Sequence, residues 1–216
     1  IRDRLWGTFS QPLKLVDFPF DRQTFTLQLV AVGYKPNEID LQPDAMGSMG
    51  IAEQLSVTDW EIPGWQTEVE SYMPIPGNGA IQLPGISFSF EAKRKTGYFV
   101  VKVILPLILI VAMSWIVFWI DPQESGIQIS VAITTMLTLI AYRFAVGADL
   151  PKVSYLSRLD FFILSATILV FASLLEVIVT SAMARQAKLE LARKWDAWSR
   201  WLFPATFCIV AIKTLI

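Results

Sequence analysis

Hydroxyl side chains recur along one long uncharged segment of the chain. The 18 residues from Ser125 through Tyr142 carry no charge, a length with which one helix crosses most of a bilayer. On a helix, steps of four and three residues group one stripe, polar at its start and apolar at its end: Ser130, Thr134, Leu137, Ala141, Phe144 and Ala148. The stripe fits the wall of a pore, where hydroxyls replace part of an ion's hydration and an apolar ring sheds water. The alternative is a helix seam, in which the hydroxyls bond other helices or their own backbone.

Three charged residues stand beside or inside the apolar segments. Glu124 lies two residues before Gly126, and a ring of its copies would attract cations and repel anions; the alternative is a solvated loop charge. Arg143 and Glu176 lie inside apolar segments, where a charge is costly and usually paired. We interpret both as structural, with these expected partners: Asp149 or a neighbouring subunit's acid for Arg143, and Arg193 or Arg200 for Glu176.

The composition suits a protein half embedded in a membrane. The 216 residues are 54% hydrophobic and 17% charged. Up to Gly97 there are 8 basic and 12 acidic residues, and after it 10 basic and 7 acidic. The sequence has no basic stripe with interleaved aromatic residues, so it does not predict nucleic-acid binding. The chain has no His and one cysteine, Cys208, and no Gly-rich phosphate loop, so we predict no catalytic group, metal or cofactor, and no disulfide within the chain.

The first 97 residues have the period-two pattern of strands. Three segments alternate apolar and polar residues: Thr24–Val32, Trp65–Tyr72 and Ile86–Ala92. Residues rich in Pro, Gly and Asn separate them. We expect about five or six short strands, part of an antiparallel β-sandwich, which usually needs seven. The first part of the sandwich is therefore expected before Ile1, in an N-terminally incomplete chain.

Four apolar segments follow, and they predict a four-helix transmembrane bundle. The expected helices cover about 98–120, 126–148, 156–184 and 195–216. Basic residues between the third and fourth place that loop in the cytoplasm and residues 1–97 outside. The predicted domains are thus an extracellular sandwich, 1–97, and a membrane domain, 98–216. One bundle has only one copy of the stripe, so a pore requires a cyclic oligomer.

Several motifs, in order along the chain, carry a resemblance to a known family. They are Phe18-Pro19-Phe20-Asp21 followed by Gln23; Arg94 and Gly97-Tyr98 before Pro106; Ser114-Trp115 with Phe118-Trp119; and Leu150-Pro151-Lys152-Val153-Ser154-Tyr155. With these motifs the sequence resembles a pentameric ligand-gated ion channel, of the prokaryotic kind related to Cys-loop receptors. The resemblance implies a ring of five subunits whose pore is lined by the second transmembrane helix, and hence by the stripe above.

The resemblance also implies an ion selectivity. Glu124 stands at the mouth, where cation-conducting relatives carry a carboxylate ring. These relatives have a second carboxylate position in a tighter place next to the pore helix, and here it is occupied by the neutral Ile127, followed by the neutral Gln128. The Pro-Ala-Arg sequence of anion-conducting relatives is also absent. We expect cation selectivity.

Gating residues follow from the same resemblance. Asp21 and Arg94 are expected to form an ion pair, which is either a coupling element or purely structural. Pro19 and Phe20 are expected to press on the loop from Asp149 to Tyr155, which contains Pro151 and Lys152. Tyr72 is a candidate wall of an agonist pocket.

The chain departs from the family at two positions. Gln11 and Phe25 stand where other members have the two cysteines of the Cys-loop. This departure and the short loop before the fourth span favour a prokaryotic member, located in a bacterial inner membrane.

These inferences predict a ligand- or proton-gated cation channel. The expected partners are four further copies of the chain in a homopentamer, membrane lipid, permeant ions and an unknown agonist. Without His, proton gating would use carboxylates such as Asp21, Glu68 or Glu91. The alternatives are an anion-conducting channel of the same architecture and a membrane receptor that conducts nothing.

Overall fold

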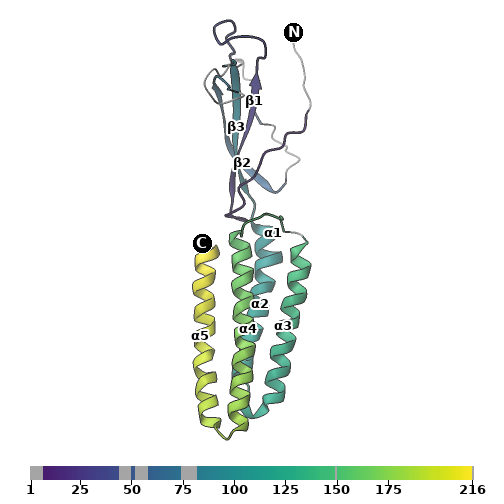
Figure 1. Cartoon of the computed structure of the whole chain (residues 1–216), viewed down its shortest axis with the longest axis vertical. Helices are drawn as coiled ribbons and strands as arrows, with labels where there is room; N and C mark the ends of the chain where they lie inside the picture. Colours follow the sequence, from purple (N-terminus) through teal and green to yellow (C-terminus); the bar gives the residue numbers. More distant parts are fainter. Residues whose placement is uncertain (1–6, 44–49, 52–57, 74–81, 149, 216) are drawn as a thin grey trace. The chain divides into compact units, whose positions relative to one another are not determined.

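The chain divides into two compact units. The computed structural model describes residues 7–43, 50–51, 58–73, 82–148 and 150–215 (Figure 1). One unit consists of Ile1–Lys14 and Phe20–Lys95 and contains the sheet; the other consists of Leu15–Pro19 and Thr96–Ile216 and contains the helices. Five residues that precede the sheet in sequence thus belong with the helices, which the boundary expected at residue 97 does not anticipate.

The sheet unit contains three antiparallel strands in the order β1-β3-β2. These are β1 (Arg22–Val30), β2 (Trp60–Val69) and β3 (Gly85–Arg94). All three were predicted, but β2 begins five residues before the expected Trp65. Pro63 and Gly64 interrupt its apolar alternation, and a bulge lies between Glu61 and Gly64, so the start of β2 is hidden from a period-two search.

The sheet has one aromatic and one polar face. Phe25 stacks on Phe90 at 5.3 Å between ring centroids, and Trp65 stacks on Phe88 at 5.4 Å. The residues between them carry hydroxyls, such as Thr26 and Ser89, whose oxygens are 3.1 Å apart. Within the described residues there is this one sheet and an isolated bridge between Tyr72 and Leu83, so the sandwich stays a prediction.

The first helical segment runs without a break from Gly97 to Trp119. It consists of α1 (Gly97–Phe99), a π-helical turn η1 (Val100–Ile104), α2 (Leu105–Ile116) and a 3₁₀ turn η2 (Val117–Trp119). Pro106 lies in the first turn of α2 but ten residues into the continuous helical segment, so its missing N–H leaves a carbonyl of the preceding turn without a helical donor. The wider turn η1 directly precedes it, and the Tyr142 hydroxyl bonds to Val103 O in that turn.

Three further helices follow with well-defined ends. A short 3₁₀ turn η3 (Pro122–Glu124) leads into α3 (Ser125–Gly147). Helix α4 (Arg158–Arg185) begins with a capping box, in which Ser157 and Asp160 each accept the other's backbone N–H. Helix α4 ends in a Schellman turn, with Lys188 N bonded to Met183 O at 3.1 Å and Ala187 at φ 61°.

Helix α5 (Leu189–Leu215) begins six residues earlier than the fourth span was expected to start. Its first residues are charged but are good helix formers, so the helix continues past its apolar part. Within the described residues, three helical segments are long and apolar enough to cross a membrane: Gly97–Trp119, Pro122–Gly147 and Arg158–Arg185. Helix α5 is not among them, so its place as a fourth span stays a prediction.

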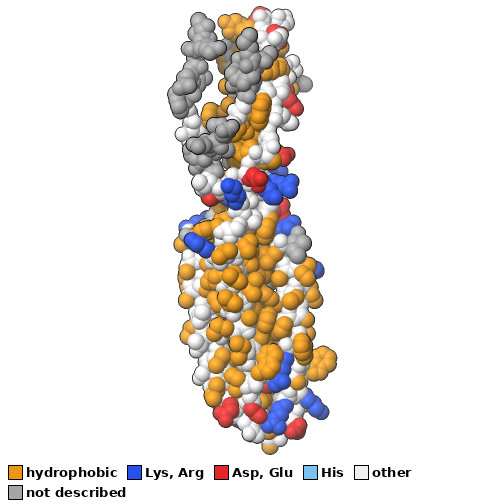
Figure 2. Space-filling model, turned by 180° about the vertical axis from the view of Figure 1, so that it is seen from behind, with side chains coloured by type: hydrophobic (Ala, Val, Ile, Leu, Met, Phe, Trp, Pro, Cys, Tyr) orange, Lys and Arg blue, Asp and Glu red, His pale blue; other side chains and the backbone are white. Residues whose placement is uncertain are grey.

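The core of the helical unit lies around α4, which packs against α2, α3 and α5. Its fully buried members come from all these helices and include Leu107, Phe118, Leu139, Phe162 and Val177. Hydrophobic side chains also cover the outside of this unit, and charged ones gather at the end where α4 meets α5 (Figure 2). An apolar exterior with a polar end is typical of a membrane protein.

Phe162 and Phe161 test this packing. Phe162 is 0% exposed and lies 5.6 Å from the Phe207 ring, whereas Phe161 is 50% exposed. We expect Phe162→Ala to lower the free energy of unfolding by about 3–5 kcal/mol, because it leaves a cavity. Phe161→Ala should change it by about 0.5 kcal/mol or less. Unfolding of both variants in detergent measures this, and equal losses would contradict the assigned orientation of α4.

Candidate functional site

The predicted stripe lies on the exposed side of α3. All six residues are exposed, with Leu137 at 61% and Phe144 at 80%. A second stripe, roughly two residues out of phase, is buried against the other helices: Gln128, Ala132, Thr135 and Leu139. The seam interpretation requires the first stripe to pack inside one subunit, and within this unit the second stripe occupies that place. The lining of a pore by the first stripe stays a prediction.

The hydroxyls of α3 donate to their own helix. Thr134 Oγ1 donates to Ser130 O at 2.8 Å, and Thr138 Oγ1 donates to Thr134 O at the same distance. The expected alternative of backbone bonding is therefore present on the stripe itself. Because the proton points inward and the side chain is exposed, the oxygen presents lone pairs outward.

The start of α3 is fixed by a residue that the sequence analysis did not single out. Asp121 accepts from Gln123 N at 3.0 Å and from Arg193 Nη2 of α5 at 2.9 Å. The backbone hydrogen bond from Gln123 and the bond from Arg193 lower the pKa of Asp121. The side chain of Glu124, next to the helix, is exposed. The start of α3 thus has a carboxylate tied to α5 and a second one facing water.

The partners expected for Glu176 were wrong. Arg193 pairs with Asp121, as just described, and Arg200 Nε donates to Phe118 O at 2.9 Å. Glu176 Oε1 instead accepts from Ser199 Oγ at 2.9 Å. Both arginines find acceptors near the end of the bundle, so neither turns inward toward Glu176. For Arg143, the expected partner Asp149 lies outside the described residues.

The expected ion pair of Asp21 and Arg94 is present in the sheet unit. Arg94 Nε donates to Asp21 Oδ1 at 2.7 Å and Nη2 donates to Oδ2 at 3.1 Å. The guanidinium also lies 4.2 Å from the centre of the Trp60 ring, a cation–π distance. Burial, with Asp21 2% exposed, acts to raise the pKa of that carboxyl, but hydrogen bonds from Arg94 and Gln23 outweigh it and lower the pKa.

Two glutamines bind backbone groups of the chain segments around this pair, and neither role was predicted. Gln23 Nε2 donates to Asp21 Oδ2 and to Lys14 O, both at 2.8 Å, and its Oε1 accepts from Lys14 N. Gln11 Nε2 donates to Thr24 O at 2.9 Å, and its Oε1 accepts from Thr26 N at 3.1 Å. Gln11 therefore holds the backbone on both sides of Phe25, the other position at which the resemblance predicted a departure from the Cys-loop cysteines.

Residues 15–19 cap the start of α4. Arg158 N donates to Val16 O at 2.9 Å, and Leu159 N donates to Phe18 O at 3.2 Å. These are first-turn N–H groups, for which a helix has no partner of its own. The Tyr155 hydroxyl accepts from Leu15 N at 2.8 Å, and the Phe18 ring meets Phe99 edge-on at 4.7 Å.

The coupling residues expected from the sequence are only partly brought together. Pro19 is buried in the helical unit, as part of the capping segment, and Phe20 belongs to the sheet unit. Pro151 and Lys152 line a separate pocket of about 280 Å³ near the C-terminal end of α3. Segment 15–19 bonds to Tyr155, the last residue of the loop that was expected to receive it, and to the start of α4.

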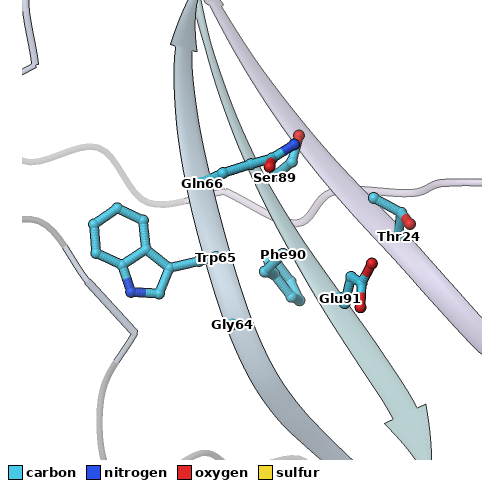
Figure 3. Close-up of a pocket in the computed structure, with 7 residues that line it drawn as sticks. All are labelled: Thr24, Gly64, Trp65, Gln66, Ser89, Phe90 and Glu91. Atoms are coloured by element: carbon cyan, nitrogen blue, oxygen red, sulfur yellow. The ribbon is translucent and has the colours of Figure 1, made fainter.

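A shallow pocket of about 370 Å³ lies on the sheet (Figure 3). Gln66 and Ser89 extend toward each other there, with Glu91 and Thr24 beside them, while Trp65 points away. Glu91, one of the expected proton sensors, lines this pocket. Tyr72 does not line it, but pairs with Leu83 through two backbone bonds of 2.8 and 2.9 Å. The loop expected beside Tyr72 lies largely outside the described residues.

The sequence of the helical unit is similar to a known class of membrane segment. Residues 103–190 match the sequence family described as the neurotransmitter-gated ion-channel transmembrane region. This match begins in the first apolar segment and ends at the start of α5. It supports the ligand-gated ion-channel family.

A whole-chain similarity points the same way. The chain is 31% identical over 173 residues to a gamma-aminobutyric acid receptor subunit beta of Caenorhabditis elegans. The alignment covers 80% of this chain and 31% of that relative. The two similarities together support the Cys-loop receptor superfamily. Because the chain spans less than a third of the length of the curated relative it matches, the agonist, ion and assembly of the whole protein are proposals.

The buried pair of Asp21 and Arg94 gives a measurable effect. Arg94→Gln leaves the Asp21 carboxylate buried without its charge partner, and we expect it to cost about 3–5 kcal/mol of unfolding free energy at neutral pH. Arg158→Gln removes the exposed 2.8 Å pair with Asp17 and should cost about 1 kcal/mol or less.

The effect should depend on pH in a defined direction. Since the folded-state pKa of Asp21 is lowered, the pair stabilises the fold above the ordinary pKa of about 3.9. That contribution is lost as pH falls through the lower, folded-state value. Unfolding measured at pH 7 and at decreasing pH should show the Arg94→Gln deficit shrinking in acid; a deficit independent of pH would contradict the account.

Proposed function

We propose that this protein is a gated ion channel, formed by a ring of five identical chains, with the exposed stripe of α3 lining the pore. The observation that carries this proposal is the division of α3 into a buried stripe that serves the fold and an exposed stripe that has no fold role in one subunit. Members of the matched family form pentameric channels that pass ions. Five copies would turn a stripe of hydroxyl and apolar residues into successive rings.

The gate of the proposed pore is the ring of Leu137. This side chain is exposed and stands between the hydroxyl residues and the outer apolar end of the stripe. Five such side chains form an apolar constriction that sheds water when it narrows. Phe144, at 80% exposure, would form a second ring nearer the outer end.

Cation selectivity is the favoured form of the proposal. The exposed Glu124 side chain places a carboxylate ring at the mouth. Thr134 of the stripe and the nearby Thr138 donate their hydroxyl protons to backbone carbonyls, so their oxygens accept and suit a cation. The alternative, an anion-conducting channel, is favoured by the similarity to a gamma-aminobutyric acid receptor subunit.

Gating in this proposal starts from a ligand or a proton bound by the outer domain. A lowered pKa makes Asp21 a poor proton sensor near neutral pH, which leaves Glu68 and Glu91 of the carboxylates considered. Segment 15–19, which contains Pro19, would transmit the change together with the following Phe20 toward α4 and the loop of Pro151 and Lys152. Tyr72 remains a candidate wall of an agonist pocket. We further propose a prokaryotic protein of the bacterial inner membrane, with the sheet outside and α5 as a fourth span.

Leu137→Ala tests the pore and its gate. We expect the full-length protein with this change to conduct without added agonist, because a smaller ring admits water. Currents are recorded from lipid bilayers under a salt gradient. Leu109→Ala is the matched control, since Leu109 is 58% exposed but lies on α2, and it should behave as the unchanged protein. Identical currents from both variants would refute the assignment, and no current from any would favour a receptor that does not conduct.

Glu124→Gln tests selectivity. A tenfold gradient of a monovalent salt separates the ideal cation and anion potentials from zero by about 59 mV each. We expect the current of the Leu137→Ala protein to reverse near the cation potential. Adding Glu124→Gln to that protein should shift the reversal potential toward zero. Glu190→Gln, at a glutamate of α5 that is 85% exposed, is the control and should shift nothing. Reversal near the anion potential before the change would establish the alternative.

A further inference from the structure

A buried polar cluster joins three helices at the inner part of the bundle. Gln128 of α3 is 0% exposed and Asp196 of α5 is 1% exposed. Gln128 Nε2 donates to Ile120 O at 2.8 Å and lies 3.4 Å from Asp196 Oδ2. Glu176 of α4 faces the same cluster and accepts from Ser199 Oγ of α5. Three elements thus direct polar groups to one place inside an otherwise apolar bundle.

The hydrogen bonds of this cluster leave a matched pair of oxygens. Each carboxyl group uses one oxygen: Glu176 Oε1 accepts from Ser199, and Asp196 Oδ2 accepts from Gln128. The other two, Glu176 Oε2 and Asp196 Oδ1, are buried and receive no hydrogen bond from the described residues. Asp196 and Ser199 lie three residues apart on α5, on the same face of that helix, so the bond from Ser199 brings Glu176 to the turn that carries Asp196. A proton on either carboxyl group would supply a donor to this cluster.

Gln128 gives independent evidence that this cluster has too few hydrogen-bond donors. Its amide is fully buried and oriented by its bond to Ile120 O, yet its Oε1 also has no donor among the described residues. Acceptors therefore outnumber donors in the cluster. A buried acceptor without a donor costs about 1–3 kcal/mol, and a second buried negative charge costs more.

The neighbouring charged residues do not supply the missing hydrogen-bond donors. Arg200 of α5 acts on Asp196 through space, but its Nε donates to Phe118 O. Lys194 of α5 lines a groove with Glu176 and does not bond to it in the structure. The groups that face the pair from α3 and α4 are the neutral Gln128 and Thr180. Two buried carboxyl groups in contact, without a cation between them, cannot both stay ionised.

We propose that Glu176 and Asp196 form a proton-binding site, in which one carboxyl group keeps its proton and donates it to the free oxygen of the other. The bound proton supplies the missing donor and leaves one negative charge, stabilised by Gln128, Ser199 and the more distant Arg200. It fastens α4 to α5, and through Gln128 it connects this junction to α3. The inference concerns the fold of one subunit, so it holds whether or not the chain conducts ions.

Infrared spectroscopy tests the site directly. The full-length protein in lipid at neutral pH should show the carbonyl stretch of a protonated carboxyl group in a dry environment. Glu176→Gln and Asp196→Asn should each abolish that band, because a single carboxylate remains and needs no proton. Ser199→Ala, which removes a donor and no carboxyl group, should keep it. A spectrum without the band, or a band that survives both substitutions, would overturn the proposal.

The pH dependence of unfolding gives a second test. A proton held by the folded pair and released by the unfolded chain makes the fold less stable as pH rises above the ordinary carboxyl range. The unfolding constant should rise by up to about tenfold per pH unit for one such proton. Glu176→Gln keeps a donor in place and should remove that dependence, and Glu190→Gln at the exposed control site should not. Equal dependence in Glu176→Gln and the unchanged protein would contradict a bound proton.

Discussion

The carboxylate of Asp21 fixes the ends of several chain segments at once. It lies at the start of β1, binds Arg94 at the end of β3, and accepts the Gln23 amide, which also holds the backbone of Lys14. Both ends of segment 15–19 are therefore set by one charge and one amide. A buried charge of this kind persists only because every neighbour donates to it, which makes the arrangement cooperative and sensitive to the loss of any member.

Helix α3 shows how one element meets two demands. Its buried stripe satisfies the fold with small and apolar residues and the one long amide of Gln128. Its other stripe is exposed, so the packing of the subunit constrains its chemistry less than that of the buried stripe. The two stripes are two residues apart in phase, and a helix turns by about 200° over two residues. Fold and proposed function are thus separated on opposite sides of the same helix.

The sequence predicted the strands and helix faces whose apolar residues recur with a regular period. It missed the element boundaries that depend on contacts with other parts of the chain. Alternation located β1 and β3, and the helical steps grouped Ser130 with Leu137, because burial leaves a regular imprint. Pro63 and Gly64 broke the pattern of β2, and the charged start of α5 looked like a loop although it is helical. Local pattern gives boundaries poorly because propensity and tertiary contact compete there.

The polar contacts of the candidate site divide in the same way. The pair of Asp21 and Arg94 could be expected from a resemblance between motifs, but the amide bonds of Gln11 and Gln23 end on backbone atoms, which have no sequence signature. Glu176 was expected to meet an arginine, since opposite charges pair more often than like ones. The structure places Ser199 and a second acid there instead, and only the course of α5 past α4 decides this.

The capping of α4 has a consequence for how this protein can be studied. Val16 and Phe18 hold α4 through main-chain oxygens, and Arg158 and Leu159 answer with main-chain nitrogens. An alanine substitution at any of these residues changes side-chain packing but deletes no atom of either bond, so alanine scanning would not isolate the connection. Exchanging the amide at Arg158 or Leu159 for an ester, which deletes the N–H alone, would reveal it. The same reasoning allows the exposed side chain of Val16 to vary while the link that its carbonyl makes stays constant.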